Sequence, residues 1–374
     1  MCNEDSRVSA TTVCSAPGKV LLAGGYLILS RPHSGTVLAL DARFYSAATV
    51  RQPTETLQPG EIAISVASPQ FGELRRYVYA SGPAGEEASL RPVGDGAQRP
   101  NRYVEIPLLY TLTTARALTV TAHSSRAMAP PLALDITLAA DNGFYSQVTA
   151  VQARGLPLTA DSLASLPPIL KPLAGDDGEI AKTGLGSSAT LVTSLVAALL
   201  HALGAIKLTG PGSFTSALSP SAKAQLEMLH ALAQLCHCAA QGKVGSGFDV
   251  CVATFGSQRY TRFSPAVLEP VLQLPDAAAP PPALLLSTIR AGAAGDAPGR
   301  DAEGARFDHE VIPFQLPPGV QVMMADVCCG AHTPSMVKRI LAWRCSHAGA
   351  PELWASYAAA SSRLQVTSRV NPNT

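Results

Sequence analysis

Charged side chains are scarce in this sequence, and neither sign dominates. Asp, Glu, Lys and Arg make up 15% of the 374 residues, and the formal net charge is +1. Nucleic-acid-binding proteins need a basic surface, so we expect no nucleic-acid partner, and any anion must be bound by a local site. The hydrophobic fraction of 47% is typical of a folded globular protein, and the length allows two domains.

Long hydrophobic runs and a secretory leader are also missing. The longest apolar stretch, at residues 191–206, is short for a membrane crossing and contains Thr, Ser and His, so it predicts a buried helix. Asn3, Glu4 and Asp5 precede any apolar stretch, whereas a signal peptide begins with positive charge. We therefore expect no membrane contact and a cytoplasmic location, with a peroxisome-like organelle as the alternative.

The eight cysteines include no C-x-x-C pair. The sequence Cys236-His237-Cys238 has no second ligand pair at zinc-finger spacing, so we interpret it as core packing rather than a metal site. A reducing compartment is the simplest interpretation of this cysteine usage.

Helices and strands alternate without the regular rhythm of strand–helix–strand units, which favours an α+β fold. Helical spacing predicts helices over residues 106–118, 188–206, 221–243 and 333–344. Apolar runs predict strands at 13–29 (with a turn at 16–19), 36–50, 61–68, 132–144, 250–263 (strand, turn, strand) and 319–329. Residues 81–100 predict a surface loop, and the proline run at 276–286 predicts an insertion or linker.

The segment KTGLGSSAT at residues 182–190 is the strongest candidate for chemistry. A helix that begins at Ser187–Ser188 presents free backbone N–H groups, and Gly184 and Gly186 let a ligand approach the backbone. Lys182 adds a cation, so the segment predicts a phosphate site. A serine-capped helix start is the plain alternative. The segment matches neither a Walker A loop nor a dinucleotide fingerprint.

Two further glycine-containing turns carry one charged residue each. In QGKVGSGFDV (241–250) the glycines surround Ser246 and deliver Asp249 to the start of a predicted apolar strand. In SAPGKVLLAGGYLIL (15–29) Lys19 lies in a predicted Pro-Gly turn. For each residue alone, an ordinary turn with a solvated side chain is the plain alternative, and Lys19 by itself is weak evidence because most turn lysines are solvated.

Taken together, the motifs resemble those of the GHMP small-molecule kinase family. The resemblance is carried by SAPGKVLLAGGYLIL, DNGFYSQ, KTGLGSSATLVT, AQGKVGSGFDV, FGSQRYTRF and HTPSMVKRILAWR, spread over residues 13–344. It is closest to the eukaryotic-type members that act on 5-phosphomevalonate. It implies an N-terminal ribosomal-protein-S5-like α/β domain that binds ATP (1–265) and the start of a ferredoxin-like C-terminal domain (266–374).

The resemblance also implies roles for individual residues, with ATP and Mg²⁺ as cofactors and 5-phosphomevalonate as the second substrate. Lys19, Asp249 and Lys182 match catalytic positions. The ATP phosphates would be held by Lys182, Gly184, Leu185, Gly186, Ser187, Ser188 and Ala189, with Ser187 or, preferably, Ser188 near Mg²⁺. The acceptor would be bound by Lys19, Asn142, Tyr145, Ser146, Ser246, Gly247, His332 and Ser335. We expect a monomer or a homodimer.

The acceptor chemistry sharpens the expected role of Asp249. A phosphate monoester has a second pKa of about 6 and is already largely dianionic at pH 7. Repulsion between anions is then the main difficulty, so we expect cations to dominate catalysis and Asp249 to orient Lys19 or a metal-bound water.

The sequence departs from the family pattern in two places. The segment CHCAAQGK lacks the acid that related kinases with hydroxyl substrates use to bind Mg²⁺, and the third glycine-rich motif of the C-terminal half does not follow residues 355–365. We therefore expect that most of the second half is absent from this chain. A catalytically impaired ligand-binding homologue and a sibling kinase acting on mevalonate or homoserine stay open as alternatives.

Overall fold

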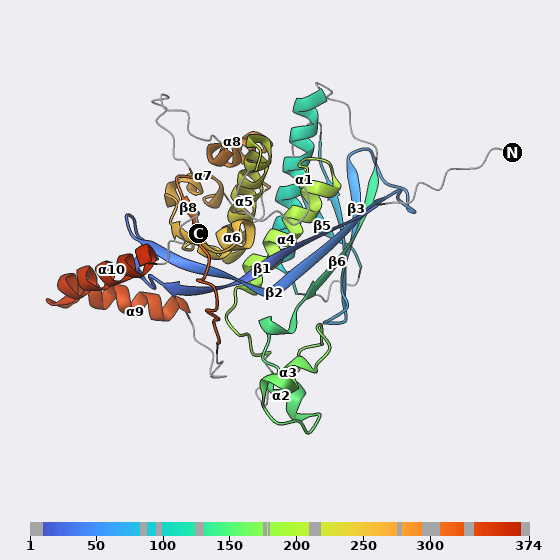
Figure 1. Ribbon diagram of the computed structural model, residues 1–374. Helices are drawn as coiled ribbons and strands as arrows, with labels where there is room; N and C mark the ends of the chain where they lie inside the picture. Colours follow the sequence, from blue (N-terminus) through green and yellow to red (C-terminus); the bar gives the residue numbers. More distant parts are fainter. Residues whose placement is uncertain are drawn as a thin grey trace.

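A long strand in the middle of a mixed sheet organises the fold (Figure 1). The computed structural model describes residues 10–82, 88–94, 99–123, 131–174, 178, 180–208, 218–274, 279–293, 307–324 and 333–367. The strands are β1 (Thr11–Ala23), β2 (Ser34–Arg51), β3 (Glu61–Ser68), β4 (Glu73–Ala80), β5 (Ser89–Pro92), β6 (Leu132–Ala140), β7 (Gln258–Thr261) and β8 (Glu310–Pro313). The helices are α1 (Arg102–His123), α2 (Val148–Gln152), α3 (Ala160–Ala164), α4 (Ser187–Ala202), α5 (Pro220–Gln241), α6 (Phe248–Phe255), α7 (Glu269–Leu272), α8 (Pro282–Ala293), α9 (Thr333–Ser346) and α10 (Ala350–Thr367).

Strand β2 joins two parts of the sheet because three strands pair with it. Strand β1 runs antiparallel along one edge of β2. The other edge is shared by β6, which pairs with residues 44–51, and β7, which pairs with residues 34–37. The sheet continues from β6 to β3 by a parallel pairing, and from β7 to β8 by an antiparallel one. The middle of β1 therefore lies where these two parts meet.

Strand β1 corrects the turn predicted at residues 16–19. The chain stays in one strand across Pro17 and Gly18, and the register shifts between Pro17, opposite Arg43, and Lys19, opposite Ala39. Proline has no N–H to donate to a ladder, so a strand accommodates it at a bulge. A bulge re-aims the side chains beside it, and Lys19 is the first side chain after the shift.

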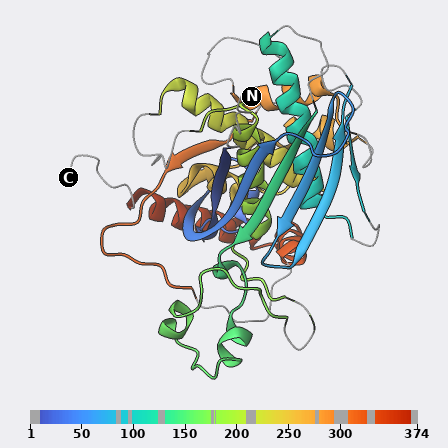
Figure 2. The ribbon, with the colours of Figure 1, turned by 90° about the vertical axis from the view of Figure 1, so that its right-hand side faces the viewer.

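Helices α1, α4, α5 and α6 gather on one side of the sheet (Figures 1 and 2). The helices predicted over 106–118, 188–206, 221–243 and 333–344 are confirmed. Leu108, Leu134 and Leu199 are fully buried between helices and sheet, where each contributes about 1.5–3 kcal/mol. The expected α+β class is confirmed, and Cys236 and Cys238 are buried in the helical core as predicted.

The prediction of strand, turn and strand over residues 250–263 is wrong in its first half. Residues 248–255 form helix α6, and only 258–261 form a strand. Short apolar runs do not distinguish a buried helix from a buried strand by their period. Val250 and Val252 are fully buried in this helix. Asp249 consequently lies in the first turn of a helix and not at the start of a strand.

Four smaller predictions are also corrected. The strand predicted to end at 144 ends at Ala140, and Asn142–Phe144 form a 3-10 turn. The predicted surface loop 81–100 contains β5, which pairs with β4. The predicted linker 276–286 contains the start of α8, whose first residue is Pro282, a position that needs no N–H donor. Residues 319–324 are irregular and exposed because no described strand pairs with them, and 325–329 lie outside the described residues.

The residues after 265 continue the N-terminal core. Val267, Leu285 and Phe307 pack in the same cluster as α5, and β8 extends the sheet. The domain boundary at 265 stays a prediction.

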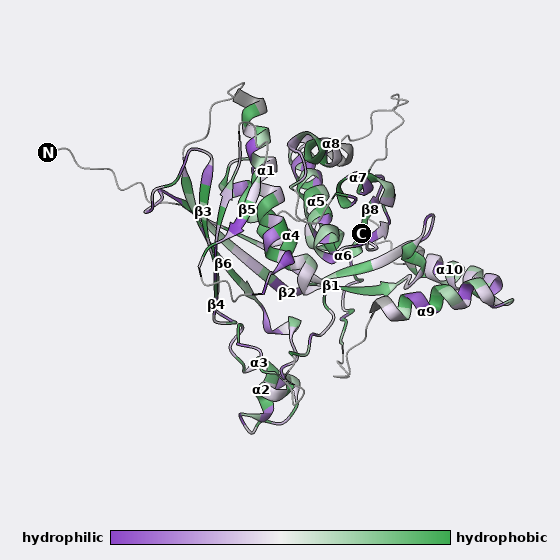
Figure 3. Cartoon of the chain, turned by 180° about the vertical axis from the view of Figure 1, so that it is seen from behind, coloured by the Kyte–Doolittle hydropathy of each residue, from purple (hydrophilic) through white to green (hydrophobic). Residues whose placement is uncertain are grey.

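Helix α9 mixes hydrophilic and hydrophobic residues and packs against α10 (Figure 3). Within the described residues, none of the helices has both the length and the hydropathy that a bilayer crossing requires.

Candidate active site

The glycine–serine turn ends in the uncapped start of helix α4. Gly186 precedes the helix in a left-handed conformation, with φ of 83°. As the N-cap residue it has no side chain that could accept a hydrogen bond from the first turn of α4. The serines occupy the first two helical positions, so neither acts as the cap. The N–H groups of residues 187–189 and the positive end of the helix dipole are therefore available to an anion.

Lys19 reaches this turn from the middle of β1. Its backbone N–H donates to the Leu185 carbonyl at 2.9 Å, and its Nζ donates to the Gly184 carbonyl at 2.8 Å. A Cβ at Gly186 would lie 3.2 Å from Cε of Lys19, so glycine makes room for the lysine stem. Burial lowers the pKa of Lys19, and the negative charge of Asp249 opposes this shift. An ammonium is thus held beside the phosphate-binding backbone.

Asp249 lies in the first turn of α6, another helix that begins at a left-handed glycine. Gly247 has φ of 84°, and a Cβ there would lie 2.8 Å from the Tyr260 hydroxyl and 2.7 Å from the Phe263 ring. The backbone can therefore take this path only without a side chain at 247. The Asp249 carboxylate accepts the Val250 N–H at 3.0 Å and is partly exposed.

His237 connects the two helix starts and was missed as a site residue by the sequence reasoning. Its Nε2 lies 3.1 Å from Oγ of Ser188 and 4.0 Å from a carboxylate oxygen of Asp249. The amide of Gln241 also lies 3.1 Å from this nitrogen. Burial lowers the pKa of His237, against the opposing effect of Asp249, so the imidazole is neutral at pH 7. It fixes the Ser188 hydroxyl relative to Asp249.

The segment that contains Tyr145 and Ser146 runs beside the turn. Tyr145 forms an isolated antiparallel bridge with Lys182, and the Ser146 N–H donates to the Ala181 carbonyl at 2.9 Å. The Lys182 side chain is exposed, whereas Tyr145 is buried against Phe71 with ring centres 5.6 Å apart. The backbone of residues 145–146 therefore lies beside residues 181–182, and their role toward a substrate stays a prediction.

Other predicted acceptor residues have structural partners. The Asn142 side chain donates to the Pro167 carbonyl at 2.6 Å and accepts the Leu170 N–H at 2.8 Å, which holds a neighbouring loop. The carbonyl of Ser246 accepts the Tyr260 hydroxyl at 3.0 Å. Ser335 is exposed near the start of α9, and His332 lies outside the described residues. Their roles toward a substrate stay predictions.

Arg262 is a second residue that the sequence reasoning did not assign. Its guanidinium donates to the carbonyls of Leu29 and Gly245, both at 2.7 Å. These contacts tie the loop before Gly247 to the end of the glycine-containing segment that follows β1. Arg262 thus positions the start of α6. The one signal for it in the sequence is that it belongs to FGSQRYTRF, one of the segments that carry the family resemblance.

The oxygen donors around His237 fit a magnesium ion. Mg²⁺ prefers oxygen ligands and is usually bound by one or two carboxylates together with substrate phosphates and water. The Asp249 carboxylate and the Ser188 hydroxyl both lie close to His237 Nε2, and Asp249 is partly exposed. This donor set suits an ion that completes its coordination with nucleotide phosphates.

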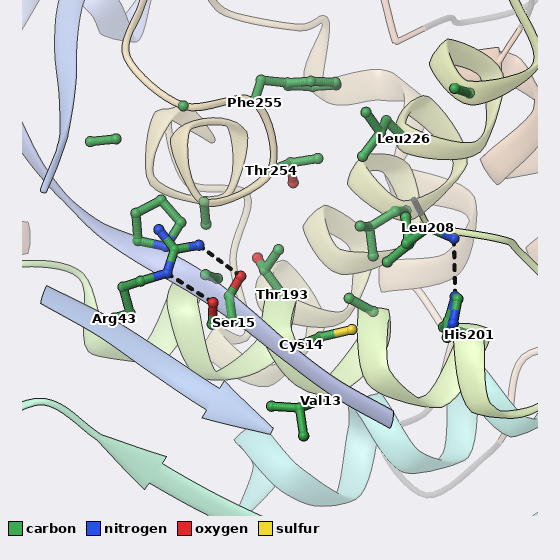
Figure 4. A pocket seen from close by; sticks show the side chains of 18 of the residues that line it. Val13, Cys14, Ser15, Arg43, Thr193, His201, Leu208, Leu226, Thr254 and Phe255 are labelled. Carbon is green, nitrogen blue, oxygen red and sulfur yellow. Dashed lines mark hydrogen bonds between the residues drawn. The ribbon is translucent and has the colours of Figure 1, made fainter. Parts of the chain in front are cut away.

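A large groove lies elsewhere in the described structure (Figure 4). It has a volume of about 1030 Å³ and runs between β1 and helices α4, α5 and α6, with Cys14, His201 and Leu226 in its lining. None of Lys19, residues 182–189 and Asp249 lines it. We assign the candidate site to the start of α4, because charged side chains and free backbone N–H groups converge there. The described residues of the groove do not combine charged side chains with the free N–H groups of a helix start in this way.

Comparison with known proteins identifies relatives over most of the chain. The profiles of known protein families give no match. The chain is 36% identical over 351 residues to the peroxisomal phosphomevalonate kinase of Arabidopsis thaliana, covering 89% of this chain and 64% of that protein. It is 36% identical over 388 residues to phosphomevalonate kinase erg8 of Aspergillus fumigatus, covering 96% of this chain and 72% of that protein. The chain thus spans about two thirds of the length of these relatives.

One solved structure shows the same fold over nearly the whole chain. The Lin0012 protein from Listeria innocua is 14% identical and superposes with a TM-score of 0.54. The match covers 96% of this chain and 73% of that protein. At this identity the likeness concerns the fold alone.

Proposed function

We propose, because the chain belongs to the phosphomevalonate kinase family, that it transfers the γ-phosphoryl group of ATP to 5-phosphomevalonate. The products are 5-diphosphomevalonate and ADP, and the reaction is a step of the mevalonate route to isoprenoids. The observation that carries the proposal is the meeting of Lys19, the uncapped start of α4 and Asp249 in one place.

The start of α4 is proposed to bind the ATP phosphates. Residues 187–189 have no side-chain cap to compete for their N–H groups within the described structure. Phosphate oxygens would accept these hydrogen bonds at the positive end of the helix dipole. Gly184 and Gly186 keep side chains away from the approach path, and the Lys19 ammonium lies beside it.

Lys19 and Lys182 are proposed to lower the repulsion between the two substrates. The acceptor phosphate and the γ-phosphate are both anions, and transfer requires their oxygen and phosphorus atoms to meet in line. Preorganised cations at this point stabilise the charge of the transition state. Lys19 is held by the Gly184 carbonyl, whereas the exposed Lys182 can turn toward the acceptor. When bound, Mg²⁺ would supply further charge neutralisation, held by Asp249 and Ser188.

Asp249 is proposed to orient groups rather than to accept a proton. The acceptor phosphate is already deprotonated at pH 7, since its second pKa is about 6. Among the described residues, the Lys19 ammonium makes its hydrogen bond to Gly184 and not to Asp249, although the charge of Asp249 still raises the pKa of Lys19. The carboxylate thus supports the lysine electrostatically, and it lies 4.0 Å from Nε2 of His237, the imidazole that contacts Ser188.

The experiment is a coupled assay of ADP release by the purified chain with ATP and Mg²⁺. We expect turnover with 5-phosphomevalonate and at least about a hundredfold lower kcat/KM with mevalonate. Mevalonate lacks the phosphate, so the groups that bind the phosphate would be left without a partner in the transition state. Calorimetry with each substrate separates binding from turnover. Binding of both substrates without ADP release contradicts the proposed activity, and faster turnover of mevalonate contradicts the proposed substrate.

We propose a cytoplasmic or peroxisomal location, since the plant relative is a peroxisomal enzyme. Imaging of a fluorescent fusion to the protein, with markers for both compartments, tests this. A monomer or homodimer is proposed as the assembly, and light scattering measures it directly.

A further inference from the structure

Four side chains that can bind a metal ion meet on the side of α5 and α6 that faces β8. We call Glu227, His230, Cys251 and His309 the buried His–Cys cluster. Glu227 and His230 lie three residues apart on α5, so both project from the same face of the helix. Cys251 comes from α6, and His309 immediately precedes β8.

The ligand atoms of the cluster are close to one another. One ligand atom each from His230, Cys251 and His309 lies within 4.8 Å of the others. Nε2 of His309 lies 3.4 Å from a carboxylate oxygen of Glu227. Tetrahedral zinc, with Zn–N of about 2.0 Å and Zn–S of about 2.3 Å, separates its ligands by roughly 3.3–3.8 Å. Side-chain shifts on the order of 1 Å therefore close the cluster around an ion.

The polar atoms of the cluster lack the hydrogen bonds that buried groups need. His230 is fully buried, and neither of its ring nitrogens has a partner among the described residues. Nδ1 of His309 also has no hydrogen-bond partner among these residues, and Oε2 of Glu227 makes no hydrogen bond there beyond its 3.4 Å contact with Nε2 of His309. Buried polar atoms are nearly always paired, and an unpaired one calls for an explanation such as an ion. A metal ion would satisfy these atoms at once.

We propose that the buried His–Cys cluster binds one zinc ion that stabilises the fold. Two imidazoles, one thiolate and one carboxylate are ligands that Zn²⁺ accepts in tetrahedral sites. The charges balance, because the two anionic ligands offset the two positive charges of the ion in a buried place. As the Zn–S bond forms, the Cys251 thiol releases its proton to water, and no oxidant or reductant is needed.

The electrostatics of the free protein agree with this. Burial, assisted by the neighbouring His309, lowers the pKa of His230 well below its ordinary value, so the ring is neutral and able to bind a metal.

The ion would tie β8 to the helical core. Cys251 and His230 are fixed in α6 and α5, whereas His309 belongs to the segment that returns to the sheet after residues outside the described range. Partly exposed Glu227 offers a path of entry. None of the four cluster residues belongs to the candidate active site as assigned above, and the inference does not depend on the proposed kinase activity.

The test measures metal content and metal binding by the whole chain. Protein purified without chelator should contain about one zinc ion per chain, and protein stripped by chelation should take up about one cobalt ion. Bound Co²⁺ should show a thiolate charge-transfer band and the visible spectrum of tetrahedral cobalt. Zinc at a hundredfold excess over its dissociation constant should raise the Tm of the stripped protein by at least about 3 °C.

Variants distinguish the cluster from other thiols and imidazoles. Cys251→Ser should remove the charge-transfer band and weaken zinc binding at least about a hundredfold. Cys236→Ser is the matched control, because Cys236 is equally buried in α5 but lies outside the cluster; it should keep the band. His309→Gln gives a second test at a less buried position. Wild-type protein without stoichiometric metal uptake, or a band that persists in Cys251→Ser, overturns the proposal.

Discussion

Replacing Lys19 with methionine isolates the charge of the lysine from its bulk. The Nζ atom donates to the Gly184 carbonyl at 2.8 Å and lies 5.6 Å from the centre of the Phe248 ring. The stem packs closely over Gly186, where an added Cβ would lie only 3.2 Å from Cγ and Cε of Lys19. A methionine fills the same space without the ammonium, so we expect the fold and the phosphate-binding backbone to persist.

The size of the effect follows from the charges that meet at the turn. An ammonium about 4 Å from a phosphate charge gains about 4 kcal/mol at an effective dielectric of about 20. Part of this attraction already holds in the ground state and does not accelerate the reaction. A remaining loss of about 2.7 kcal/mol, the scale for one preorganised stabilising group, lowers kcat about a hundredfold.

The assay is ADP release at saturating substrates, measured from neutral to alkaline pH. Lys19→Met should lower kcat at least about a hundredfold with an unchanged urea unfolding curve. Because burial lowers the pKa of Lys19, the wild-type rate should fall as pH rises through that lowered pKa. Lys19→Arg keeps its charge there and should lose this alkaline decline. Near-normal turnover in a folded Lys19→Met protein refutes the reasoning.

The remaining predictions concern the two helix starts. Asp249→Asn should lower kcat without moving the acidic limb of the pH–rate profile; a displaced limb would identify a base. His237→Asn removes the imidazole beside Ser188 and should cost about 1 kcal/mol, roughly a fivefold loss of kcat/KM for ATP; unchanged kinetics contradicts this. Gly247→Ala should lower the free energy of unfolding by about 2–4 kcal/mol because three atoms lie within 3.0 Å of the new Cβ, whereas the open Gly155→Ala control should lose about 1 kcal/mol; equal losses contradict the steric argument. Since burial lowers the pKa of His237, the unfolded chain takes up its proton first, so urea unfolding should show stability falling below about pH 6.5; a level profile contradicts this.

The sequence was sufficient for the family, the fold class and the main helices. The resemblance to GHMP kinases is confirmed by the phosphomevalonate kinase relatives. Helices α4 and α5 could be predicted because apolar residues repeat at helical spacing over a long segment, which favours a helix over a strand. The short run after Gly247 could not, because six apolar residues fit a strand or a helix, and burial between neighbouring elements decided the outcome.

The site shows the same division between local and long-range information. Lys19 and the turn are 165 residues apart, and their contact rests on strand register. His237 could not be found from its neighbours, because the cysteines on both sides of it suggested core packing. Its contact with Ser188 depends on which face of α5 meets the start of α4, and that is a property of helix packing. Asn142 shows the reverse case, since its side chain holds a loop.

The pairing of β2 with both β6 and β7 has a consequence for how the chain is made. On a ribosome, β1 and β2 emerge early, but Gln258, which pairs with Val37, follows much later. At about 5–20 residues per second, the delay is on the order of 10–40 s. During that time one end of β2 displays an unpaired edge, the kind of surface on which nascent chains associate wrongly. We therefore expect the yield of folded protein to depend on how well this edge of β2 is shielded until β7 has been synthesised.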